Sequence, residues 1–370
     1  MELTVSLLLS TMVGVSTEMY EISVSSKSGS YSIYIDKSQG PLSIPGISIV
    51  DSNTKSHVFA ENSSECIFID ASEEIKTLPS CESIIIKLND LGLTRSGSIN
   101  AVGGGTTQDL ATLAASLYMR GVPWVYYPTT LMSMTDSCIG GKSAINAGDR
   151  KNLIGNFHPP TEIRINTRFL ETNSDIDIVN GLSEAVKICF ARGASAFEQY
   201  LSMPSSLAPG NDEDTARMIN HTLTTKKWFV EIDEFDLHER QLLNFGHSFA
   251  HALESATSYL IPHGTAVGIG MIAALKHPES SGSDRSKKLI NYSLKMLDRT
   301  KSSISDGMKL FDEAKFVTAL DRDKKNSNEY LRLILLNAND ELEITSLERN
   351  DYQLQIALSS LNEAISEVLL

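Results

Sequence analysis

The chain has 370 residues, 41% of them hydrophobic and 21% charged, and its 32 basic and 46 acidic residues give a formal net charge of −14. This length favours two domains that share a cleft. A strongly acidic chain lacks the broad positive field that binds nucleic acids or anionic membranes, so we expect neither partner. No apolar run reaches the roughly 18 residues that a membrane-spanning helix needs.

The N-terminal segment and the cysteines indicate the compartment. Residues 3–15 are apolar, but no basic residue precedes Lys27, whereas a secretory signal begins with positive charge. We therefore expect residues 1–16 to form an N-terminal extension. The four cysteines show no CxxC spacing, which favours a reducing compartment, and we expect a cytoplasmic protein.

Strand and helix patterns alternate over residues 17–158. A SSKSGS turn between two short apolar runs predicts a hairpin. Strands are expected at residues 20–24, 31–35, 48–50, 98–102 and 122–127, and helices at 73–88 and 109–119. This alternation predicts an α/β, Rossmann-like nucleotide-binding domain, whose mostly parallel sheet places binding loops at the carboxyl ends of its strands.

Helical patterns dominate after Pro159 and Pro160. Helices are expected at residues 178–200, 212–230, 240–258, 266–275, 287–297 and 314–320, and a single late strand at 331–336. Residues 159–370 are therefore predicted to form a mainly α-helical second domain.

A triple glycine follows the strand expected at residues 98–102. Gly103, Gly104 and Gly105 stand where that strand gives way to a helix. Glycines at such a junction let backbone amides approach a pyrophosphate at the helix N-terminus. A purely structural turn is an equally common explanation, so the motif gains meaning from its position at the edge of the sheet.

Three of the eight histidines cluster late in the chain. His247 and His251 are four residues apart, and His263 opens the next apolar helix. Two imidazoles and a carboxylate, for which Glu184 is the candidate, would make a three-ligand zinc site with a free position for substrate. Alternatively, Glu184 pairs with Lys187 three residues on, and the histidines are ordinary core or cap residues.

Several cations lie in apolar or loop contexts rather than in charge runs. They are Arg120, Lys142, Lys151, Lys187, Lys226 and Arg240. Converging cations suit a phosphorylated, carboxylated small molecule, although for any one of them a surface position is the more common explanation. Arg240 precedes His247 by seven residues, two helical turns, so we expect both on one helix face.

Five ordered motifs carry a family resemblance. They are GGGTTQDLATLAASLYMRG, YPTTLMSMTDSCIGGKSAIN, KNLIGNFHPP, GLSEAVK and RQLLNFGHSFAHALE. Together they resemble the 3-dehydroquinate synthases, which are sugar-phosphate cyclases related in fold to the iron- and zinc-dependent polyol dehydrogenases. The resemblance implies an NAD-binding domain over residues 17–158 and a helical metal- and substrate-binding domain over residues 159–370.

The resemblance also implies roles for individual positions. The metal ligands would be Glu184, His247 and His263. The NAD contacts would be Asp51, Asn53, Glu73, Lys76, Gly103, Gly104, Gly105, Asp109, Thr129, Thr130, Lys142, Lys151, Phe169 and Thr172. The substrate and catalytic positions would be Arg120, Asp136, Lys142, Asn152, Lys187, Lys226, Asp236, Arg240, Asn244, His251 and one of Lys324 and Lys325.

Some positions depart from the family pattern. Gln108 stands where glycine is usual, Thr265 stands where an acidic residue is usual, and Asp236 replaces a glutamate. The usual glycine before Glu73 is Ser72. These changes leave open a specialised relative, whereas the retained KNLIG motif and the second histidine of HSFAH favour a 3-dehydroquinate synthase.

The resemblance implies a lyase of the shikimate pathway of aromatic amino acid biosynthesis. It would convert 3-deoxy-D-arabino-heptulosonate 7-phosphate to 3-dehydroquinate and phosphate, with NAD reduced and reoxidised within each turnover. Zinc is the expected metal, cobalt the alternative, and a homodimer the expected assembly. A sibling cyclase acting on another sugar phosphate is the first alternative. A metal- and NAD-dependent polyol dehydrogenase is the second, but it would release NADH and have little use for so many cations.

Overall fold

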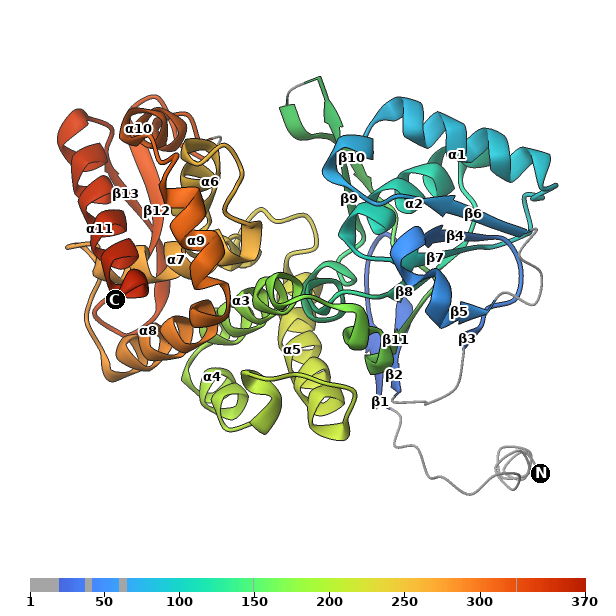
Figure 1. Cartoon of the computed structure of the whole chain (residues 1–370), viewed down its shortest axis with the longest axis horizontal. Coiled ribbons are helices and arrows are strands. Elements are labelled where there is room, and N and C mark those ends of the chain that lie inside the picture. The colour runs from blue at the N-terminus through green and yellow to red at the C-terminus, as the bar shows by residue number, and fades with distance from the viewer. Residues whose placement is uncertain (1–19, 37–41, 60–64, 149, 324) are drawn as a thin grey trace.

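The computed structural model describes residues 20–36, 42–59, 65–148, 150–323 and 325–370. The predicted extension at residues 1–16 and the candidate Lys324 lie outside these ranges. Figure 1 shows a sheet-containing body, coloured blue to green, and a helical body, coloured yellow to red, with the green helices between them. Within the described ranges, none of the helices has the length and apolar character to cross a membrane.

The first body is built on a seven-stranded sheet. Its strand order is β1 (Tyr20–Val24), β2 (Tyr31–Asp36), β11 (Glu162–Asn166), β8 (Trp124–Pro128), β7 (Ile99–Gly103), β4 (Ser48–Asp51) and β6 (Cys66–Ile69). The predicted hairpin β1–β2 is antiparallel, and all other pairs are parallel. Every residue of β4 and β7 is buried, as expected for parallel strands covered on both faces.

Shorter elements complete this body. They are the helices α1 (Leu78–Asp90) and α2 (Gly105–Leu117), the short pair β3 (Leu42–Ser43) and β5 (Val58–Phe59), and the antiparallel hairpin β9 (Lys142–Ala147) and β10 (Arg150–Phe157). The helix expected from residue 73 begins at Leu78, after a 3₁₀ turn. Pro79 lies in its first turn, where a missing N–H leaves no helical bond unmade.

Strand β11 was not predicted, and it pairs with both β2 and β8. Its five residues follow Pro159 and Pro160, beyond the expected domain boundary at residue 158. The sheet therefore includes chain that the pattern assigned to the helical half. We propose that the first domain continues through β11 and the 3₁₀ helix Thr167–Thr172.

The second body confirms the predicted helical character. Its helices are α3 (Asp175–Arg192), α4 (Ala194–Leu201), α5 (Glu213–Ile232), α6 (His247–Ala256), α7 (His263–Lys276), α8 (Asp284–Leu297), α9 (Lys301–Met308), α10 (Glu313–Asp321) and α11 (Asp351–Leu369). Helix α7 is apolar on all sides because α3, α6, α8 and α11 surround it. The strand expected at 331–336 is half of a hairpin, β12 (Tyr330–Leu336) and β13 (Leu342–Glu348).

The helix expected over residues 240–258 is two elements. Glu239–Asn244 is a 3₁₀ helix, and α6 begins at His247 after Gly246, whose φ is +78°. A Cβ on Gly246 would lie 2.7 Å from the backbone nitrogen of Met271, so this glycine also lets α6 approach α7. The prediction that Arg240 and His247 share one helix face is therefore wrong.

Candidate active site

A large cavity lies between the two bodies. Its volume is about 1240 Å³, which exceeds the roughly 300–1,000 Å³ of a typical single-ligand site and leaves room for two ligands. On the sheet side it opens at the ends of β4 and β7, between which the strand order changes direction. Parallel α/β sheets bind ligands at this point because the loops after the two strands diverge there.

The glycine turn at Gly104 and Gly105 lines the cavity on the side of the sheet. Gly104 is the N-cap residue of α2 and provides no side-chain cap, and Gly105 has open space beside it, with no atom within 4 Å of an added Cβ. Both line the cavity, so uncapped N-terminal amides of α2 are available to an anion. These residues therefore fit the pyrophosphate of a dinucleotide.

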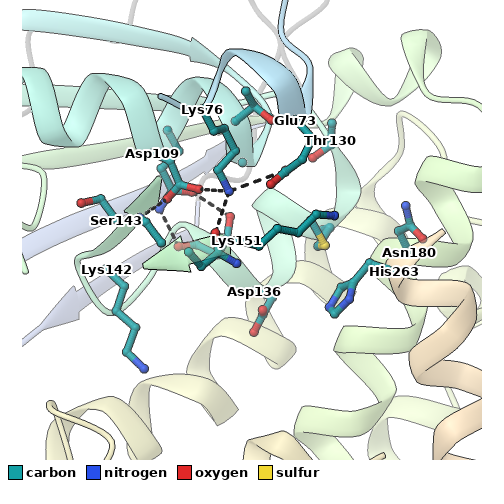
Figure 2. A pocket seen from close by; sticks show the side chains of 18 of the residues that line it. Glu73, Lys76, Asp109, Thr130, Asp136, Lys142, Ser143, Lys151, Asn180 and His263 are labelled. Atoms are coloured by element: carbon teal, nitrogen blue, oxygen red, sulfur yellow. Dashed lines mark hydrogen bonds and ion pairs between the residues drawn. The ribbon is translucent and has the colours of Figure 1, made fainter. Parts of the chain in front are cut away.

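Charged side chains frame this turn. The ammonium of Lys76 lies 2.8 Å from Asp109 Oδ2 and donates to Asn152 Oδ1 at 3.1 Å. Figure 2 shows the side chains of Lys76 and Asp109 pointing toward one another. Burial raises the pKa of Asp109, an effect that Lys76 opposes. At the end of β4, Asp51 accepts a bond from the backbone nitrogen of Asn53. These groups come from four separate segments and all line the same cavity.

The three predicted metal ligands converge on the helical side. Oε1 of Glu184, in α3, lies 3.6 Å from Nε2 of His247 and 3.5 Å from Nε2 of His263. The three ligand atoms lie within 4.8 Å of one another. Gly264 allows this approach, because a Cβ there would lie 2.2 Å from the Cα of Asn180 in α3. Two imidazoles and a carboxylate at this spacing fit one divalent ion.

The alternative pairing of Glu184 with Lys187 is also present, and both side chains are buried. Burial opposes ionisation of Glu184, but Lys187 and the two histidines hold its pKa well below the usual range. Burial and the positive charge of Lys187 hold the pKa of His247 well below its usual value. The carboxylate is therefore ionised and the His247 imidazole neutral, which are the forms that bind a metal ion. Burial opposes protonation of His263, but its hydrogen bonds to Glu184 and Glu254 raise the pKa of this imidazole to about 10, so a metal ion has to displace a proton from it.

Substrate-side cations line the same cavity, and each has a nearby acid. Lys226 lies 2.8 Å from Asp136 Oδ1, and Lys142 lies 2.8 Å from Asp236 Oδ2. Arg240 is 4% exposed and donates to the carbonyl of Glu234. Burial and the charge of Arg240 lower the pKa of Lys142. Lys226 and Arg240 are buried at the cavity, whereas the Lys142 side chain is 43% exposed. An anionic ligand entering the cavity would meet all three cations.

Gly140 leaves the space that the guanidinium of Arg240 occupies. Its φ is +106°, and an added Cβ would lie 2.2 Å from Nη2 of Arg240. We expect Gly140→Ala to push the guanidinium aside and raise the KM for an anionic substrate about tenfold, equivalent to roughly 1.4 kcal/mol. Steady-state kinetics of the variant would measure the change of KM, and thermal unfolding would measure the accompanying change of stability.

Gly193→Ala is the matched control for this substitution. Gly193 has a φ of +116° with no atom within 4 Å of an added Cβ, so both variants carry backbone strain of about 1–3 kcal/mol but only one meets Arg240. An equal change of KM in the two variants would show that strain alone is responsible.

Most of the other predicted site residues also line the cavity. These are Glu73, Thr129, Thr130, Lys142, Lys151, Asn152, Thr172, Asn244 and His251. Gly103, Phe169 and Glu184 are buried and do not belong to its lining. Lys325 is outside the lining but 3.6 Å from Asp323, which belongs to it. Arg120 is exposed and lies outside the lining of its own chain's cavity.

The structure adds residues that the sequence did not single out as functional. Gln108 is buried, donates to the Ser137 carbonyl at 2.8 Å and accepts from the Ser137 hydroxyl at 2.7 Å. It thus ties the first turn of α2 to the π-helical turn Ser133–Ser137 that carries Asp136. The feature of the sequence that could have indicated this role is a glutamine among the small residues of GGGTTQD. Glu254 and Asn180 also line the cavity.

Comparisons with solved structures place the fold. A 2-deoxy-scyllo-inosose synthase complexed with carbaglucose-6-phosphate, NAD⁺ and Co²⁺ matches with a TM-score of 0.76 and 21% identity, over 93% of this chain and 99% of that chain. The 2-epi-5-epi-valiolone synthase of Streptomyces hygroscopicus subsp. jinggangensis 5008, with NAD⁺ and Zn²⁺ bound, matches with a TM-score of 0.71 and 22% identity, over 92% and 98%. These matches confirm the predicted fold.

Sequence comparisons identify the family. A family model described as 3-dehydroquinate synthase N-terminal matches residues 66–180, and one described as 3-dehydroquinate synthase C-terminal matches residues 181–326. The 3-dehydroquinate synthase of Thermoanaerobacter pseudethanolicus is 32% identical over 284 residues, which are 76% of this chain and 79% of the relative. Because the two family models together match residues 66–326 and this relative is 32% identical over 76% of the chain, the chain belongs to the 3-dehydroquinate synthase family.

Proposed function

We propose that the chain converts 3-deoxy-D-arabino-heptulosonate 7-phosphate to 3-dehydroquinate and phosphate. The observation that carries this proposal is the composition of one cavity. The two histidines of the metal-binding cluster, an uncapped glycine turn and the buried cations Lys226 and Arg240 all border it. A polyol dehydrogenase needs the first two features, whereas the cations suit a substrate with a phosphate and a carboxylate.

Glu184, His247 and His263 would hold a divalent metal, and the residues around Gly104 and Gly105 would hold NAD. When bound, the metal supplies a Lewis acid for a substrate oxygen and NAD a reversible hydride acceptor. Zinc is our choice of metal, because two imidazoles and one carboxylate are a common catalytic zinc set. Zn²⁺ and Co²⁺ in the two structural neighbours support a divalent ion of this kind.

The polar residues would orient the substrate. Lys142, Lys226 and Arg240 bind its two anionic ends, with Asn152 beside them and His251 towards the phosphate. Burial and the charge of Lys325 lower the pKa of His251 to about 4, so at neutral pH this imidazole is neutral and offers one hydrogen-bond donor and one acceptor. Fixing one substrate conformer between these groups reduces the entropic barrier to elimination and ring closure.

A homodimer in the cytoplasm completes the proposal. The resemblance assigns Arg120 to a substrate site, yet this side chain is exposed and outside its own chain's cavity. A second copy that received Arg120 at its cavity would account for both facts. The four cysteines form no disulfide, and three of them are buried, which suits a reducing compartment.

An assay of phosphate release tests the reaction. With NAD and zinc present, we expect phosphate to appear in proportion to heptulosonate phosphate consumed, while absorbance of reduced nicotinamide stays flat after the first turnover, since each hydride returns within the cycle. NADH accumulating with product would instead establish a dehydrogenase. No phosphate from this substrate, but phosphate from another sugar phosphate, would establish a sibling cyclase.

A further inference from the structure

Glu254 lies on the side of His263 that faces away from Glu184. It belongs to α6, two helical turns after His247 and therefore on the same face of that helix. Its Oε2 lies 3.4 Å from Nδ1 of His263, while Nε2 of His263 faces Glu184. The Glu254 side chain is 12% exposed and borders the cavity.

The two nitrogens of His263 therefore have different neighbours. An imidazole that binds a metal through Nε2 carries its proton on Nδ1, and an acceptor behind Nδ1 fixes both the tautomer and the plane of the ring. His247 has such an acceptor in the carbonyl oxygen of Phe245, 3.3 Å from its Nδ1. For His263 the corresponding acceptor is the carboxylate of Glu254, which adds a negative charge and makes the imidazole a stronger donor.

The ring of His263 needs a second contact to fix its orientation more than the ring of His247 does, because it is more exposed. The His247 side chain is 11% exposed, whereas the His263 side chain is 37% exposed at the cavity. His247 and His263 are the first residues of their helices. At that position the backbone alone does not fix the side-chain rotamer. A carboxylate behind the more exposed ring supplies the missing restraint.

We propose that Glu254 is a positioning residue that orients His263 for metal binding and is not itself a ligand. This inference rests on the metal site in the proposed function. The competing arrangement is a second cation held by His251, Glu254 and His263, whose donor atoms also lie within 4.8 Å of one another. The two arrangements predict different numbers of bound ions per chain. They also predict different effects of Glu254→Gln, because an amide oxygen can still accept the hydrogen bond from His263 but is a poorer metal ligand than a carboxylate.

The test measures metal binding without substrate or NAD. Wild type, Glu254→Gln and Glu254→Ala are stripped, reloaded with Zn²⁺ or Co²⁺, and titrated against a coloured chelator. We expect one ion per chain in all three, an affinity about 10–100-fold weaker for Glu254→Ala, and a smaller loss for Glu254→Gln, whose amide oxygen still accepts from Nδ1. The visible spectrum of the cobalt-loaded alanine variant should also change, because the His263 ring is free to tilt.

Glu198→Ala is the matched control, since it removes one carboxylate from an exposed pair with Lys288 and gives the same change of net charge. Unchanged metal affinity in Glu254→Ala would overturn the inference, and so would two ions per chain in wild type with one lost in both Glu254 variants. The inference and the proposed reaction can fail separately. A metal site that depends on Glu254 in a protein that releases no phosphate would retain the first and reject the second.

Discussion

His247→Ala is expected to abolish both stoichiometric metal binding and turnover while the protein stays folded. The imidazole supplies one of three donor groups around a common point, and the two that remain cannot hold a divalent ion tightly. The substitution removes a side chain at the cavity wall rather than from the apolar core, so the loss of stability should be modest. Metal analysis, phosphate-release kinetics and thermal unfolding of the same preparation measure the three effects.

His238→Ala is the control for this variant, because it removes an exposed imidazole that is not part of the cavity lining. It should retain metal and activity. Full metal occupancy in a well-folded His247→Ala protein would show that His247 is not a ligand.

Arg240→Ala is expected to reduce kcat/KM by more than Arg240→Lys, for which we expect at least about a tenfold loss, roughly 1.4 kcal/mol. Lysine keeps the positive charge but loses the planar fork that can bind an oxyanion through two hydrogen bonds. Alanine also removes the positive charge that balances Asp136 and Asp236 at this end of the cavity. The comparison of kcat/KM between the two variants separates charge from geometry.

The control for the arginine variants is Arg217→Ala, which removes a surface guanidinium paired with Asp214 on the same helix. Such exposed pairs contribute little to stability, so activity and unfolding temperature should stay close to wild type. Wild-type kinetics from Arg240→Ala would remove the main support for a phosphorylated, acidic substrate.

Local pattern was sufficient for the elements that form through neighbouring residues. The β1–β2 hairpin follows from a short polar turn between alternating strands, and the junction at Gly103 follows from an apolar run that ends in glycines before a helical period. The segments around His247 and His263 were likewise recognised, because a helix repeats its face every three to four residues. Each of these signals is contained within about twenty residues of chain.

Other features depended on partners far away in the sequence. Strand β11 is only five residues long, and it is a strand because β2 and β8 are positioned on either side of it. The helix expected through residue 246 breaks there because Gly246 packs on the backbone of α7, a contact that no local period reveals. Both errors have the same origin, which is that tertiary packing overrides local propensity.

The sequence by itself determined the fold class, the family resemblance and the types of residue available for chemistry. Only the tertiary structure brought Glu184 within reach of two histidines more than sixty residues later, paired Lys226 with Asp136 ninety residues earlier, and placed Glu254 behind His263. It also placed Arg120 outside its own cavity. The physical reason is that secondary structure is encoded by short-range periodicity, whereas the distance between side chains on different elements is set by how whole helices and strands pack.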